Sequence, residues 1–288
     1  MRRRCFISLL GAGVLLPLKT AVARANSAGV TLLNADLELG GDWGGSASTD
    51  VAAVIESMRT ACLAGVALFS DHQPEKLRVD DQIGSNPSVW LHTGFPKTAW
   101  IIVIVDTRDW CNLAYQFGHE LGHVFCNSWK PDAKPRNPCQ WIEEALVEAF
   151  SLRGLGRMAD DWVRAPPFPN DAAYAGSIRS YRETILAGYR TAAQDQGIAA
   201  GFGAWFKAHK SFLDQHGGVD AARGAVSTML DLLEGDVATI ADMGALNRWP
   251  GRSGVPLPEY LDLWEKSCAE LNAPGRLPVQ VRDLLAGP

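Results

Sequence analysis

The sequence lacks several features that would place it in a common class. Its six cysteines contain no C-x-x-C spacing, so a structural zinc site built from four cysteines is not expected. It has no basic stripe, and its formal net charge of −5 argues against a nucleic-acid binder. No internal repeat is visible, and no second apolar run follows the N-terminal one, so we expect no membrane span in the mature chain. The 288 residues otherwise have the composition of a globular protein, with 47% hydrophobic and 20% charged residues.

The N-terminus has the three parts of a secretory signal peptide. Residues 1–4 are a charged start, residues 5–18 are a mostly apolar run, and an A-x-A end follows at 21–23 or 23–25. The arginines before the apolar run also resemble a twin-arginine export signal. We therefore expect residues 1–25 to be removed and the protein to be exported to the bacterial periplasm or the extracellular space. The alternative is an uncleaved N-terminal anchor.

Five cysteines lie beyond this segment, at positions 62, 111, 126, 139 and 268. In an oxidising compartment at least one disulfide is expected, and the odd number leaves one thiol over. Cys126 and Cys139 bracket a loop, which favours their pairing.

The order of sequence patterns predicts an α+β fold. A small mixed N-terminal lobe with a β-sheet (26–127) ends in a central helix, and a helical C-terminal lobe (128–288) follows. A continuous β-branched run at 100–105 predicts a strand buried on both faces. Other strands are expected at 76–80 and 88–93, with a loop or short strand within 26–48. Helices are expected at 51–69 (capped by Thr49 and Asp50), 110–127, 140–155, 171–195, 200–216, 219–233, 236–246 and 257–272.

One motif carries the chemistry. Residues 119–123 read His-Glu-Leu-Gly-His, the H-E-x-x-H pattern. On a helix, histidines four apart lie one turn above the other, so His119 and His123 can reach one metal ion. Glu120 lies on the flank, where it could take a proton from a metal-bound water. The opposite face is apolar and can be buried: Leu113, Phe117, Leu121, Val124 and Phe125.

A third ligand is expected from the next helix, because a catalytic zinc site needs three protein ligands and one open position. The segment W-I-E-E-A-L at 141–146 offers two adjacent carboxylates, Glu143 and Glu144. On residue types alone, either could reach the ion.

Over about residues 100–150 the chain resembles the gluzincins, the zinc metallopeptidases that include thermolysin and the alanyl-aminopeptidases. In that family H-E-x-x-H supplies two ligands and a glutamate on a downstream helix supplies the third. The aminopeptidases carry W-x-x-E-G-[FL] there, and W-I-E-E-A-L looks like it, aligning Glu144 with the ligand. Thermolysin-like members place an acid one turn later, hydrogen-bonded to the first histidine, and Glu148 fits that position. The resemblance implies a zincin-like fold and Zn²⁺ bound by His119, His123 and Glu144.

The resemblance also implies a mechanism. Glu120 acts as the general base toward a zinc-activated water and later delivers the proton to the leaving amine. The family usually adds a Tyr or His that hydrogen-bonds the oxyanion. His209 lies at a family-like distance after Glu144 and is predicted for this role, with Tyr181 and Tyr189 as alternatives.

Two departures from the family bear on the activity. Ala145 stands where the aminopeptidases have glycine, and no G-x-M-E-N segment is present. The missing segment argues against aminopeptidase activity and leaves an endopeptidase or another peptidase-like activity open. We predict a zinc metallopeptidase acting on a peptide or protein substrate, near the strand at 100–105, with Trp90 and Trp100 as candidates to flank the groove. The alternatives are a non-catalytic zinc-binding or protein-interaction module with the same fold, and a helical binding protein whose motif is accidental. The intact Glu120 favours the enzyme.

Overall fold

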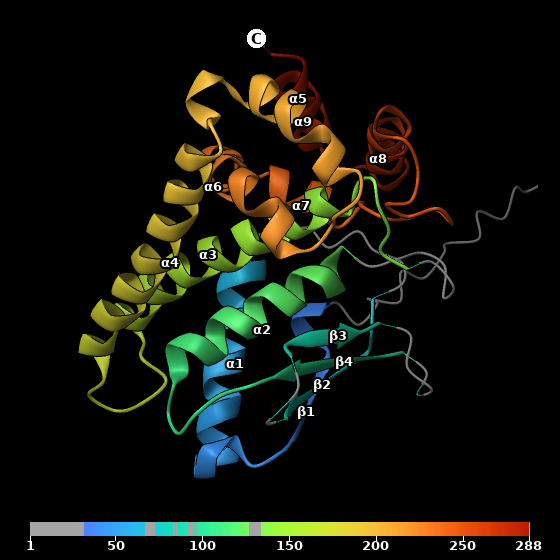
Figure 1. The fold of residues 1–288 in the computed structure, drawn as a ribbon. Helices are drawn as coiled ribbons and strands as arrows, with labels where there is room; N and C mark the ends of the chain where they lie inside the picture. Colours follow the sequence, from blue (N-terminus) through green and yellow to red (C-terminus); the bar gives the residue numbers. More distant parts are fainter. Residues whose placement is uncertain are drawn as a thin grey trace, which may run out of the picture.

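The computed structural model describes residues 32–66, 73–82, 84, 86–91, 95, 97–126 and 134–287. The predicted signal peptide lies outside this part of the chain, as do residues 67–69 and residue 127 of two predicted helices. Within it the protein is α+β, which confirms the expected class: a four-stranded sheet packs against a larger set of helices (Figure 1). Among these residues, no helix combines the length and apolar character needed to cross a bilayer.

The sheet is mixed, with strand order β1-β2-β4-β3. Its strands are β1 (Asp36–Gly40), β2 (Lys76–Asp81), β3 (Ser88–Trp90) and β4 (Thr98–Val103). β1, β2 and β4 are parallel, whereas β3 lies at the edge and pairs antiparallel with β4, placing Val89 opposite Ile101. Ile101 and Val103 are fully buried and Ile102 is 6% exposed, so the predicted buried strand is confirmed, shifted two residues toward the N-terminus.

The helices are α1 (Ser48–Leu63), α2 (Trp110–Phe125), α3 (Gln140–Arg164), α4 (Ala175–Asp195), α5 (Phe202–Leu213), α6 (Val219–Gly235), α7 (Thr239–Met243), α8 (Leu257–Leu271) and α9 (Arg276–Ala286). The helical C-terminal half was predicted in outline, but α9 was missed. Its N-cap is Gly275, which adopts a left-handed backbone conformation with a φ of +69°. The Asp242 carboxylate accepts hydrogen bonds from the backbone N–H groups of Gly275, Arg276 and Leu277. A helix start stabilised by an acid more than thirty residues away leaves no local signal.

Two predicted helix ends were wrong. α1 stops at Leu63, because Gly65 adopts a φ of +76°, and its N-cap is Ala47 without a side-chain cap from Thr49 or Asp50. α3 continues to Arg164, nine residues past the predicted end, so Asp160 and Asp161 lie within it.

Helix α3 is the central element of the helical part. It packs against α1, α2, α4 and α6, and residues on nearly every side of it are buried. Its buried residues include three charged side chains, Glu143, Glu148 and Arg153. Each of these charges needs a partner, because a buried ion is costly unless it is paired.

Glycine allows α2 and α3 to approach closely. A Cβ atom added at Gly122, inside the H-E-L-G-H motif, would lie 2.8 Å from Cβ of Val147 on α3. Since real Cβ atoms do not come this close, only glycine permits the observed helix separation. The approach brings the histidine-bearing side of α2 next to the first turns of α3.

One continuous hydrophobic core joins the two predicted lobes, with Val54, Phe117, Phe150 and Trp264 among its members. The boundary between residues 127 and 128 therefore stays a prediction.

The predicted disulfide was wrong. Cys126 and Cys139 are both buried free thiols, as are the other three cysteines of the described residues. The Cys139 Sγ instead donates a hydrogen bond to the backbone oxygen of Val255.

Candidate metal centre

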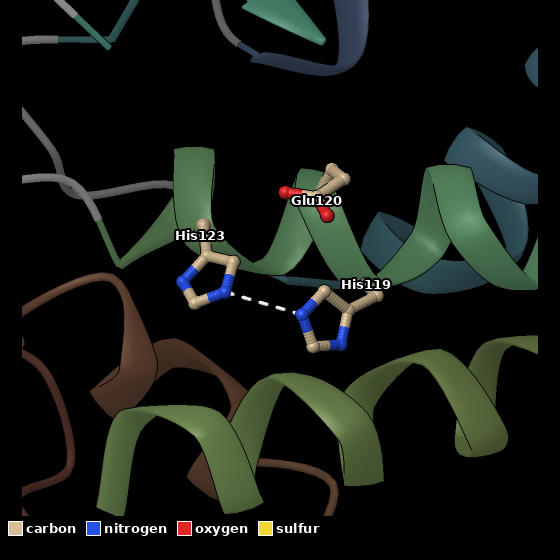
Figure 2. A group of neighbouring side chains, drawn as sticks. All are labelled: His119, Glu120 and His123. Carbon is tan, nitrogen blue, oxygen red and sulfur yellow. Dashed lines mark hydrogen bonds between the residues drawn. The ribbon is translucent and has the colours of Figure 1, made fainter. Parts of the chain in front are cut away.

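Helix α2 presents the two histidines of the motif. It begins where the Asp109 carboxylate accepts the backbone N–H of Asn112, and the apolar residues of its predicted inner face are all buried. Figure 2 shows both imidazole rings on one side of α2 and Glu120 on a different side. The Nε2 atoms of His119 and His123 lie 3.2 Å apart, so the rings converge on one point.

The carboxylate of Glu144 on α3 faces that same point. Its Oε2 atom lies 3.8 Å from Nε2 of His119 and 3.7 Å from Nε2 of His123. Tetrahedral zinc with bonds near 2.0–2.2 Å separates its ligand atoms by roughly 3.3–3.5 Å. The three donor atoms are within a few tenths of an ångström of that spacing, and two imidazoles plus one carboxylate are a typical donor set for catalytic zinc. These residues therefore fit the ion.

Glu143, the neighbour of Glu144, approaches His123 from the other side of the ring. Its Oε1 atom lies 2.8 Å from Nδ1 of His123, and its side chain is 1% exposed. Two residues far along the chain hold it there: Arg252 donates to Oε1 at 2.7 Å, and Asn247 donates to Oε2 at 2.8 Å. An acceptor on Nδ1 keeps the proton on that nitrogen and leaves Nε2 free to bind a metal.

Glu148 stands in the corresponding relation to His119. Its Oε1 atom lies 3.4 Å from Nδ1 of His119, within ion-pair distance but not aligned for a hydrogen bond. The Tyr115 hydroxyl donates to both carboxylate oxygens, at 2.9 and 2.8 Å, and the Tyr189 hydroxyl lies 3.4 Å from that of Tyr115. Each histidine thus has its own buried carboxylate behind it.

The charges at the site follow from these contacts. Burial would raise the pKa of Glu143, but Arg252 and then His123 outweigh it and hold the pKa at about 2. Burial would lower the pKa of His123, but Glu143 and Glu144 raise it well above its ordinary value. Glu148 outweighs burial in the same way and raises the pKa of His119. The cluster therefore concentrates negative charge around two imidazoles, which favours a cation between them.

Glu120 is different from the other carboxylates. It is 4% exposed, yet no hydrogen bond to its carboxylate is made by any residue the structure describes. Burial raises its pKa. It offers a carboxylate oxygen within 4.8 Å of the histidine nitrogens, so it lies close to any ion held there.

A pocket of about 730 Å³ opens over this centre. Glu120, Glu144 and both histidines line it, together with the edge strand β3, Lys134 and Arg252. Trp90, at the end of β3, is 59% exposed and borders the pocket as predicted. The strand beside the pocket is β3 rather than the predicted 100–105. Trp100 does not line the pocket, and its ring lies under the Arg78 guanidinium, 5.1 Å from the ring centroid.

The structure does not bring His209, the residue predicted to hydrogen-bond the oxyanion, to the pocket. His209 stacks on Trp205 and its Nδ1 lies 2.9 Å from the Trp205 backbone oxygen, an interaction within one helical turn. The alternatives are also engaged elsewhere: Tyr181 donates to the Asn112 side chain at 3.2 Å, and Tyr189 contacts Tyr115. None of these three candidates lines the pocket.

Several site residues were missed from the sequence. Asn247 and Arg252 lie more than a hundred residues after Glu143 and carry no motif, and Glu143 itself was considered only as a ligand. Tyr115 could have been found from the sequence, because it lies four residues before His119 and hence on the same helix face.

No protein-family model, curated protein or solved structure matches this chain.

Proposed function

We propose that the protein is a zinc-dependent hydrolase that cleaves peptide bonds. The proposal depends chiefly on one observation: two Nε2 atoms and one carboxylate oxygen, from His119, His123 and Glu144, converge at distances of 3.2, 3.7 and 3.8 Å at a pocket. Three further observations support the proposal. The sequence resembles the gluzincins, the site opens into a pocket, and a buried carboxylate lies behind each histidine.

The protein's own residues have distinct roles in this proposal. His119, His123 and Glu144 would hold the ion, which when bound supplies a Lewis acid and a water of lowered pKa. Glu143 orients the His123 ring through its hydrogen bond with Nδ1, and Glu148 supplies a negative charge beside Nδ1 of His119. Glu120 takes a proton from the attacking water and returns it to the leaving amine, a role suited to a buried carboxylate to which none of the described residues donates a hydrogen bond.

The edge strand suggests how a peptide is positioned. In the described part of the chain β3 is an edge strand that pairs with β4, and its residues 88–90 line the pocket beside the histidines. An extended peptide can add to such an edge through backbone hydrogen bonds. The exposed ring of Trp90 offers apolar contact for one of its side chains.

A non-catalytic zinc-binding module with the same fold is the second candidate. It shares the three ligands, so zinc binding does not distinguish it from the enzyme. Glu120 does, because a module that only binds zinc has no need for a base beside the ion.

The test measures zinc content and peptide hydrolysis on the same preparations. We expect about one zinc per chain in the wild type and in Glu120→Gln, with hydrolysis of a fluorogenic peptide library lower by about 10²–10⁴-fold in the variant. Glu270→Gln, which alters a half-exposed carboxylate on α8, is the control and should behave as wild type. Zinc binding without cleavage in the wild type would favour the binding module. Absence of zinc after reloading would reject both.

A further inference from the structure

Of the three buried charges on α3, Arg153 differs from the two glutamates in its contacts with the described residues. Glu143 and Glu148 contact histidines, but Arg153 is 3% exposed and its Nη1 and Nη2 atoms have no hydrogen-bond partner among the described residues. A guanidinium has five N–H donors and stays protonated, so Arg153 is a buried positive charge that forms no ion pair with the acids the structure describes.

Arg153 lines a pocket of about 500 Å³ between α3, α4 and α6. These helices pack together on the side of the molecule away from the sheet (Figure 1). Arg153 is nine residues beyond Glu144, about 14 Å along the axis of α3. The pocket is therefore separate from the candidate metal centre.

The acids at this pocket are already paired with other arginines. Asp160 accepts from Arg179 at 2.9 Å. Glu234 accepts from Arg182 at 2.8 Å, and Glu183 pairs with Arg182 as well. Arg179 and the three acids are largely exposed, so they form the rim and leave the interior positively charged.

Arg157 adds a second, half-buried cation to the pocket lining. It lies one helical turn after Arg153, lines the same pocket, and its Nε atom is also buried without a partner. Neither residue makes an ion pair with a described acid. Burial and then the charge of Arg157 lower the pKa of Arg153. The nearby Cys62 does not supply the missing charge, because burial raises the pKa of its thiol to about 12.

We propose that Arg153 and Arg157 bind a phosphate-type oxyanion in this pocket. Guanidinium groups match pairs of oxyanion oxygens with parallel N–H donors, and the unpartnered nitrogens are of this kind. The anion neutralises two like charges that otherwise repel each other at a spacing of four residues. Its source is either free inorganic phosphate or the phosphate group of a small phosphomonoester.

The test titrates the purified protein with inorganic phosphate and with phosphoserine, at constant ionic strength set with chloride, by calorimetry and thermal melting. We expect one phosphate per chain and a rise in Tm in the wild type, with affinity at least tenfold lower in Arg153→Met and in Arg157→Gln. Arg179→Gln, which changes a rim arginine paired with Asp160, should stay within about twofold of wild type. Phosphoserine binding as tightly as phosphate identifies a phosphomonoester as the source, and phosphate binding alone identifies the free ion.

Two controls keep the result interpretable. Without phosphate, Arg153→Met should melt no lower than wild type, because it removes an uncompensated charge. If that variant does not fold, Arg157→Gln carries the comparison. No phosphate-dependent heat or melting shift in the wild type, or equal affinity in the Arg157 variant, would overturn the site. Phosphate bound to an ion at the histidines would persist in both arginine variants, so it is distinguished from this pocket.

Discussion

Glu143 contacts Nδ1 of His123, at 2.8 Å from its Oε1 atom, while the adjacent residue, Glu144, faces Nε2 of the same ring. Consecutive residues on a helix are about 100° apart, so two neighbouring carboxylates can reach opposite sides of one imidazole. Of these two neighbouring glutamates, Glu144 is the one whose carboxylate faces both Nε2 atoms.

The first prediction separates these two glutamates. Glu144→Gln should abolish stoichiometric zinc binding, because it removes a charged ligand. Glu143→Gln should keep the site but weaken zinc about 10–100-fold, the usual effect of losing the group behind a metal-bound histidine. Competition with a chelator of known affinity measures both. Equal affinity in the two variants would show that the roles have been assigned wrongly.

The second prediction concerns Tyr115. Its hydroxyl donates to both oxygens of Glu148, so Tyr115→Phe should loosen that carboxylate and lower zinc affinity several-fold while the fold is kept. Tyr181→Phe removes a hydroxyl bonded to Asn112, outside the Glu148 contact, and is the matched control. Zinc titration with parallel circular dichroism checks the expectation. A Tyr181 variant weakened as much as the Tyr115 variant would argue against this specific role.

The third prediction tests the close approach of α2 and α3. Gly122→Ala forces a Cβ to within 2.8 Å of Val147, so it should lower the free energy of unfolding by about 1–3 kcal/mol despite the better helix propensity of alanine. Gly176→Ala places its Cβ in open space within α4 and should be neutral or stabilising by up to about 1 kcal/mol. Denaturant unfolding measures both. If Gly122→Ala is as stable as Gly176→Ala, the helices are not held at this distance.

The fourth prediction concerns the thiols. Burial raises the pKa of Cys62 and Cys139 to about 12, so at pH 8 only on the order of 10⁻⁴ of each is thiolate. Iodoacetamide should leave both unmodified in the native protein, and reactivity should rise as the pH approaches 12. After denaturation without reductant, Cys126 and Cys139 should both be labelled, as counted by mass spectrometry. A mass two daltons lower with two cysteines unlabelled would mean that the disulfide forms after all.

The sequence by itself determined the elements whose signals are local. The H-E-x-x-H spacing, the apolar face of α2 and the unbroken run of β4 depend on residues a few positions apart, so periodicity was sufficient to predict them. The α+β class followed from the order of these patterns.

Only the tertiary structure decided what surrounds the two histidines. Arg252 and Asn247 reach Glu143 from more than a hundred residues away. Asp242 accepts the first backbone N–H groups of α9 from more than thirty residues away, and His209 contacts a backbone oxygen of its own helix. The unpaired Arg153 reads in the sequence as an ordinary helical arginine. The physical reason is the same in each case: the partner of a buried charge is set by packing between distant segments, which no local pattern of residues records.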